Sequence, residues 1–269
     1  MPSNRIATYP QVDFLVIVNP NSGPGNAPLP GPDYVREVPR LNAYPNVRTI
    51  GYVKVDWCRR PLAESCHDVQ LYADWKQKHE HEFPGLYVEG IFVDETPNHY
   101  SDDRLAYLDA LGQFIKDADG LQGDRMIMHN PGTPPDADMA PLGRPDAICT
   151  CEEPWPRFQG DEVQTRLRDY YFERSRSAYQ ISGIPSEQIA VAVRKLSRTA
   201  RYIFATDLVE DFYESFSQTS WENFVAAIVA VNEARYSQGA CEGDSQEELQ
   251  RGESQAYQGQ GRHLREDLY

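Results

Sequence analysis

The sequence contains no apolar run close to the roughly 18 residues that a membrane-spanning helix requires. Its first apolar run is only Phe14–Val18, and the residues before it lack the basic start that is typical of a signal peptide. We therefore expect no membrane span and recognise no signal peptide. By sequence alone this is compatible with the cytoplasm and leaves the true compartment open.

Positive charge is also scarce. Lys and Arg number 26 against 41 Asp and Glu, which gives a formal net charge of -15. Such an excess of negative charge argues against nucleic acid and anionic membranes as partners. A neutral or cationic ligand is the expectation that remains.

Metal and cofactor signatures are missing as well. The five cysteines form neither a CxxC pair nor a Cys/His zinc spacing. Cys149 and Cys151 are two residues apart in a predicted strand, so we expect them on one face, unbridged, as free thiols. The glycine-rich stretch NPNSGPG lacks the GxGxxG dinucleotide signature, and its prolines prevent a helix from starting there. We predict no metal and no cofactor.

Short apolar runs alternate with helical patterns along the chain. The runs predict strands, and they resemble strands of a parallel sheet that is covered on both faces. The predicted strands are Phe14–Val18, Thr49–Val55, Gly90–Val93, Arg125–His129, Ala147–Cys151, Ile189–Val193 and Tyr202–Ala205. The predicted helices are Asp68–Lys76, Ser101–Lys116, Glu162–Tyr179 and Trp221–Ala234. In Ser101–Lys116, Ser101 is the predicted N-cap, with Asp102 and Asp103 in the first turn.

This alternation predicts an α/β fold: a single-domain (β/α)8 TIM-type barrel over residues 1–236, with an eighth strand that is short or unrecognised. An open doubly wound sheet is the alternative. From residue 237 the composition changes to Gln, Gly, Glu and Ser with few aliphatic residues, which predicts a flexible polar tail over 237–269.

Polar and aromatic residues follow nearly every predicted strand, where the active sites of (β/α)8 barrels lie. The candidates for substrate binding are Asn19, Asp56, Trp57, His129, Asn130, Trp155 and Asp207. Acidic pairs follow two of the strands: Asp94 and Glu95 after the third, Glu152 and Glu153 after the fifth. Neighbouring residues of a strand point to opposite faces, so the members of each pair need not share a role.

Carboxylates after the third and fifth strands, without a nucleophilic Ser or Cys, favour glycoside hydrolysis. That reaction needs one protonated acid at the leaving oxygen and one ionised carboxylate opposite it. A metal site built from carboxylates is the chemical alternative, although His129 is the sole histidine at these strand ends. Solvated acidic loops are the simplest non-functional explanation.

Six stretches in one order resemble the spherulin-4 family, glycoside hydrolase family 135. They are NPNSGPG, GYVKVDW, DVQLYADW, GIFVDETP, HNPGT and DAICTCEEPW. The resemblance implies a (β/α)8 barrel that cleaves internal α-1,4-linked N-acetylgalactosamine bonds in the polysaccharide galactosaminogalactan. The family's Asn-Pro and Asn-Pro-Gly motifs match Asn19-Pro20 and Asn130-Pro131-Gly132.

The resemblance also selects the acidic residues. The family's Asp-Glu pair matches Asp94 and Glu95, and its single Glu, six residues after Asp146, matches Glu152 rather than Glu153. We predict that Asp94 is the nucleophile of a retaining hydrolase, that Glu152 is its acid/base, and that Glu95 supports or exchanges with them. We expect a monomer that acts on an amino-sugar polymer. The alternative is a non-catalytic glycan-binding spore or cell-wall protein on the same barrel.

Overall fold

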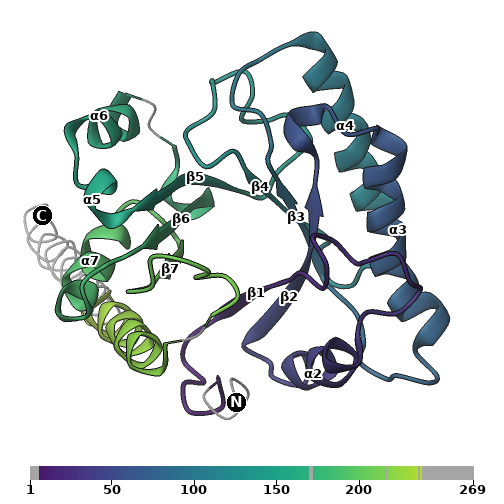
Figure 1. Cartoon of the computed structure of the whole chain (residues 1–269), viewed down its shortest axis with the longest axis horizontal. Helices are drawn as coiled ribbons and strands as arrows, with labels where there is room; N and C mark the ends of the chain where they lie inside the picture. Colours follow the sequence, from purple (N-terminus) through teal and green to yellow (C-terminus); the bar gives the residue numbers. More distant parts are fainter. Residues whose placement is uncertain (1–5, 170–171, 216, 236, 238–269) are drawn as a thin grey trace, which may run out of the picture.

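Seven parallel strands form one sheet in the order in which they occur along the chain (Figure 1). They are β1 Phe14–Val18, β2 Val47–Lys54, β3 Gly90–Asp94, β4 Met126–Asn130, β5 Ala147–Pro154, β6 Ser177–Ser182 and β7 Tyr202–Ala205. The computed structural model describes residues 6–169, 172–215, 217–235 and 237. The sheet curls into a nearly closed barrel in which β7 approaches β1 without a recorded strand pairing between them.

Helices surround the sheet on its outer side (Figure 1). They are α2 Pro32–Asn42, α3 Leu62–His79, α4 Asp102–Asp117, α5 Trp155–Phe158, α6 Asp161–Asp169 and α7 Ile189–Leu196, and residues 218–235 are also helical. Short 3-10 turns occupy Asp56–Cys58, Arg174–Arg176 and Ser186–Gln188. The architecture is a single-domain barrel of the (β/α)8 type. The predicted eighth strand is not seen in the part of the chain that the structure describes.

Side chains of the strands alternate between the barrel interior and the helices. The interior cluster consists of Ile50, Phe92, Met126, Met128, Ala147, Cys149 and Ala178. The side chains between them point outward into two larger clusters with the helices. Because both faces of the sheet are buried, most of these strands consist largely of consecutive apolar residues. We call a residue's place in this alternation its inward or outward parity. It also decides which side chains at the strand ends face the mouth of the barrel.

Six of the seven predicted strands are confirmed, and their ends shift by no more than three residues. The N-cap of α4 is confirmed too, because the Ser101 hydroxyl oxygen accepts a hydrogen bond from the backbone N–H of Arg104. The predicted helices Asp68–Lys76 and Trp221–Ala234 lie within α3 and within the helical residues 218–235.

The sixth predicted strand is wrong. Ile189–Val193 lies in helix α7, where Ile189, Ala192, Val193 and Leu196 form one buried face at helical spacing. The true sixth strand, β6, overlaps the end of the predicted helix Glu162–Tyr179, which in the structure ends as α6 at Asp169. In β6, the polar residues Ser177, Gln180 and Ser182 interrupt the apolar ones, so the segment is not an apolar run.

The predicted tail, 237–269, falls outside the described residues except for Ser237. Within the described ranges, no helix is long and apolar enough to cross a membrane. The same ranges contain no group of three His, Cys, Asp or Glu side chains arranged to hold a metal ion.

Candidate active site

The side-chain amide of Asn130 bridges two carboxylates at the mouth of the barrel. Its Nδ2 donates to Asp94 Oδ1 at 2.8 Å and to Glu152 Oε2 at 2.7 Å. The three residues come from the neighbouring strands β3, β4 and β5 and share the inward parity of the interior cluster. Because Asp94 Oδ1 and Glu152 Oε2 bond to the same nitrogen, the distance between them is no greater than the sum of the two hydrogen-bond lengths.

The loop after β4 fixes the orientation of the bridging amide. The backbone N–H of Gly132 donates to Asn130 Oδ1 at 3.0 Å, so the NH2 group must face the carboxylates. Gly132 has a φ of 68°, a left-handed conformation that glycine adopts without steric cost. The backbone carbonyl of Gly132 also accepts from the N–H of Glu152 at 3.0 Å. The Asn130-Pro131-Gly132 segment therefore ties β4 to β5 directly at the site.

A β-bulge in β5 decides which acid of the Glu152-Glu153 pair faces the interior. The register of β5 against β6 shifts between Cys149 and Cys151. Cys149 packs in the interior cluster, whereas Cys151 packs outward against the helices. Our expectation that the two cysteines share a face is therefore wrong. The extra residue turns Glu152 inward, as bulges near active sites commonly re-aim a side chain.

Glu153 points outward and has a structural role. It is 8% exposed, and its Oε1 lies 2.8 Å from Arg166 of α6. Arg157 lies 3.6 Å from its other oxygen. The two adjacent glutamates thus occupy opposite faces of the strand, one at the mouth and one under the helices.

Two tyrosines complete the bonding of the carboxylate pair. The Tyr52 hydroxyl donates to Asp94 Oδ2 at 2.5 Å, and the Tyr213 hydroxyl donates to Glu152 Oε1 at 2.7 Å. Burial and the Asp94 carboxylate raise the pKa of Tyr52. Although much of the Tyr213 ring is exposed, desolvation of its hydroxyl and the Glu152 carboxylate raise the pKa of Tyr213. Both hydroxyls therefore keep their protons as donors. The sequence analysis predicted neither tyrosine. A signal existed for Tyr52, because it lies two residues after Ile50 on β2 and therefore points to the same, inward side.

Glu95 stands apart from the bridged pair. Its Oε1 forms an ion pair with Lys54 at 3.1 Å, and its Oε2 is buried with no hydrogen-bond partner among the described residues. Glu95 has a φ of 53°, and its carbonyl accepts from the N–H of Trp57 at 2.7 Å. The residue therefore joins the ends of β2 and β3 and does not contact Asp94 or Glu152 through a recorded hydrogen bond.

The loop after β2 forms part of the rim. Asp56, Trp57 and Cys58 all have positive φ values, of 48°, 53° and 65°. Such strain in non-glycine residues persists only where the surroundings impose it, and it clusters at functional sites. Trp57 is 46% exposed, with the Arg59 guanidinium 5.0 Å from its ring centre. An open hollow of about 550 Å³ beside this loop is lined by Ser22, Lys54, Asp56, Arg59, Arg60 and Pro61.

The remaining predicted residues do not join the carboxylates. His129 is buried on the outward side of β4, and burial lowers its pKa to about 4. Trp155 lies in the outer core, where its indole N–H donates to Gln188. Asp207 accepts from the Ser186 hydroxyl at 2.8 Å. Asn19 is exposed, and its Oδ1 accepts from the Gly23 N–H, which shapes the loop after β1.

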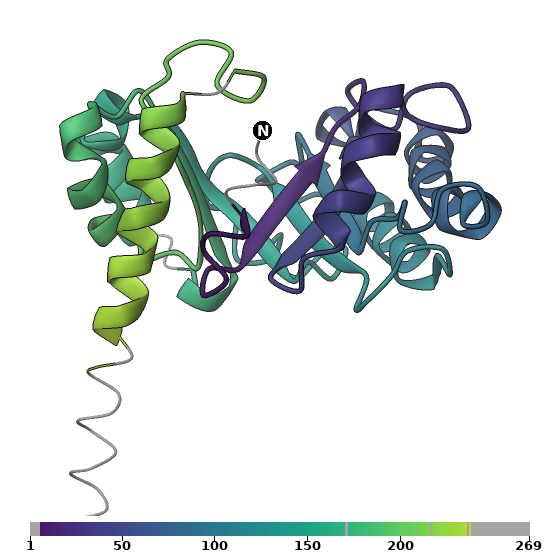
Figure 2. The same cartoon turned by 90° about the horizontal axis from the view of Figure 1, so that it is seen from below.

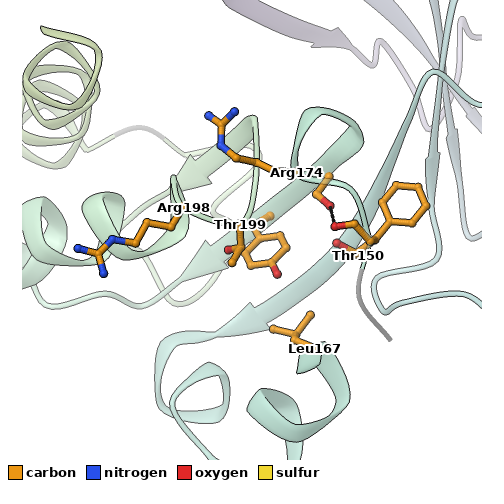
Figure 3. A pocket seen from close by; sticks show the side chains of 8 residues that line it. Thr150, Leu167, Arg174, Arg198 and Thr199 are labelled. Atoms are coloured by element: carbon orange, nitrogen blue, oxygen red, sulfur yellow. Dashed lines mark hydrogen bonds between the residues drawn. The ribbon is translucent and has the colours of Figure 1, made fainter. Parts of the chain in front are cut away.

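A separate pocket lies outside the barrel, between β5, β6 and α6 (Figure 3). It is lined by Thr150, Leu167, Phe172, Arg174, Ser177, Tyr179, Arg198 and Thr199 and holds about 60 Å³. Ligand pockets are typically ~300–1,000 Å³, so this one is too small for a sugar ring. The Arg174 and Arg198 guanidinium groups point away from it in Figure 3, which leaves the barrel mouth as the candidate site.

Fold and site together define a (β/α)8-type barrel protein in which an asparagine bridges two carboxylates near the C-terminal ends of the strands. Residues 2–228 match the sequence profile described as spherulation-specific family 4. The chain belongs to this spherulin-4 family.

Two similar proteins support that assignment. Spherulin-4 of Physarum polycephalum is 32% identical over 127 residues, which are 46% of this chain and 33% of the relative. The matched region thus spans about a third of that curated relative's length. The crystal structure of Aspergillus clavatus Sph3 in complex with GalNAc aligns with a TM-score of 0.77 at 33% identity, covering 84% of this chain and 89% of that one.

Proposed function

We propose that this protein is a retaining glycoside hydrolase that cleaves within chains of α-1,4-linked N-acetylgalactosamine, as in galactosaminogalactan. The observation that carries the proposal is the Asn130 amide that bridges Asp94 and Glu152. The bridge holds the two bonded oxygens close together, which supports the short separation, about 5–5.5 Å, between the carboxyl groups of retaining enzymes. Inverting enzymes hold theirs roughly 6.5–9.5 Å apart to admit a water.

Asp94 is the proposed nucleophile. Both of its oxygens are held, by Asn130 and by Tyr52, at the end of a strand whose backbone pairs on both sides. In the first step its carboxylate attacks the anomeric carbon, and a glycosyl-enzyme ester forms as the bond to the leaving oxygen breaks.

Glu152 is the proposed acid/base. It gives its proton to the leaving oxygen in the first step. In the second step it takes a proton from a water that attacks the same carbon and releases Asp94. Glu95, linked to Lys54, supports the rim beside Asp94 in this proposal.

The choice of sugar rests on similarity. The structure that aligns over most of this chain was solved with GalNAc bound, and the six motif stretches implied the same sugar. The exposed ring of Trp57 and the open hollow beside it suit a polymer that extends along the rim. Stacking of a sugar on an exposed aromatic ring is a common means of binding such chains, because the ring and the sugar face are both flat and partly apolar.

The test is the release of reducing ends from a panel of polymers. We expect release from α-1,4-linked N-acetylgalactosamine polymers as oligosaccharides, and none from chitin, whose N-acetylglucosamine units are β-linked. Binding of the galactosamine polymer without release of reducing ends would favour the non-catalytic glycan-binding alternative. Release from chitin alone would contradict the proposed substrate.

A further inference from the structure

The loop after β7 carries a tyrosine into the carboxylate site. The ring of Tyr213 stacks on Phe204, with ring centres 6.1 Å apart, and packs against Phe212 at 4.3 Å. Phe204 shares the inward parity of Tyr202, so it projects from β7 into the barrel. Figure 2 shows this loop at the end of the barrel toward which β1 points. The loop thereby places the Tyr213 hydroxyl at the mouth of the barrel, against Glu152.

The same loop extends across the mouth. Tyr213 reaches Glu152 on β5, while its neighbour Glu214 lies near Tyr34 of α2. Burial and the Glu214 carboxylate together raise the pKa of Tyr34. Two consecutive loop residues therefore act on two different elements of the barrel, β5 and α2. This placement holds the phenol against Glu152 although 58% of Tyr213 is exposed.

Asp94 and Glu152 accept the same number of these hydrogen bonds, but their tyrosine donors come from different kinds of segment. Each has one oxygen on Asn130 and the other on a tyrosine hydroxyl. Tyr52 belongs to strand β2, whereas Tyr213 belongs to an exposed loop that a bound polymer would contact. The acid that Tyr213 holds is the one that must both release and recover a proton in each cycle.

We infer that Tyr213 is a positioning residue that holds Glu152 as the acid/base, while Tyr52 holds Asp94 as the nucleophile. The inference rests on the proposed hydrolase function and adds a residue that neither the sequence motifs nor the comparisons assign. A hydroxyl that donates to a carboxylate favours its ionised form. Removal of the hydroxyl therefore favours the protonated form of the carboxylate that it contacts.

The two tyrosines should consequently act on different limbs of the pH profile of kcat/KM. The basic limb reports loss of the proton from the acid, and the acidic limb reports protonation of the nucleophile. Tyr213→Phe should move the basic limb to higher pH by about half a unit to one unit. Tyr52→Phe should move the acidic limb to higher pH instead. Tyr100→Phe is the matched control, because the Tyr100 hydroxyl donates to Asp102 at 3.0 Å and to neither Asp94 nor Glu152.

A second readout does not depend on turnover. Carbon-13 NMR of labelled glutamate carboxyl groups follows the titration of Glu152, whose signal is identified by its loss in Glu152→Gln. Tyr213→Phe should move this titration to higher pH by a similar amount, and Tyr100→Phe should leave it in place.

The outcomes separate this inference from the proposed function. Absence of turnover in the unmodified protein would remove the hydrolase proposal, and the NMR titration would still decide whether Tyr213 acts on Glu152. An unchanged Glu152 titration in Tyr213→Phe would overturn the inference even in an active enzyme. A shift of the acidic limb in Tyr213→Phe would overturn the assignment of Glu152 as the acid/base.

Discussion

Asp94→Asn and Glu152→Gln should each lower kcat on an N-acetylgalactosamine polymer by about 1,000-fold or more. Asp94→Asn replaces the nucleophile with an amide, and Glu152→Gln removes the group that transfers the proton; such a proton transfer alone contributes about 10²–10⁴-fold. Both substitutions keep the side-chain shape. The measurement is the initial rate of reducing-end release, with circular dichroism to confirm folding.

Glu153→Gln is the matched control for Glu152→Gln. The two residues are adjacent, but Glu153 faces outward and pairs with Arg166 and Arg157. Its substitution leaves Arg166 without its buried partner, so we expect a loss of about 2–3 kcal/mol of unfolding free energy. This expected loss of unfolding free energy is smaller than for a fully buried ion pair, because Arg166 is partly exposed. The kcat should stay within about threefold of the unmodified protein; a larger fall would contradict the outward placement of Glu153.

Asn130→Asp should lower kcat/KM by about 100-fold or more. The substitution replaces the NH2 group that donates to Asp94 and Glu152 with an oxygen, so that three carboxyl groups converge at one point. Like charges at this distance favour protonation, so one of the three should hold a proton near neutral pH and the two roles can no longer be kept apart.

The stability of Asn130→Asp should also depend on pH. Mutual repulsion raises the folded-state pKa of a clustered carboxyl group above its unfolded value. The stability of the variant relative to the unmodified protein is therefore retained below about pH 4 and falls as pH rises toward neutrality. Thermal melting between pH 4 and pH 7 measures the difference. Asn26→Asp, the same change at an exposed loop position, should show little such dependence.

Much of the candidate site was predictable because it lies at strand ends. Asp94 and Asn130 end β3 and β4, Glu152 lies two residues before the end of β5, and the ends of such parallel strands meet on one side of a barrel. The apolar runs located β3, β4 and β5 well enough to place these residues together. Glu152 was preferred over Glu153 only through the family motif, because the bulge that turns it inward has no clear signal in CTCEE.

Other parts of the site required the fold. His129 follows the rule that strand ends are functional, yet its parity is outward and it is buried away from the mouth. Trp155 begins helix α5 beyond the end of β5 and packs in the outer core. Tyr213 was missed because it is 61 residues from Glu152 in the sequence, in a loop without periodicity. Contacts of this kind depend on how a loop folds back, which local patterns do not encode.

If Asp94 and Glu152 form a retaining catalytic pair, the first product keeps the α configuration of the substrate. Proton NMR during hydrolysis of an α-1,4-linked N-acetylgalactosamine oligomer reports the anomeric proton of the newly formed reducing end before mutarotation. We predict that the α anomer appears first and the β anomer only later, as mutarotation proceeds. Initial formation of the β anomer would show inversion and would contradict a covalent intermediate on Asp94.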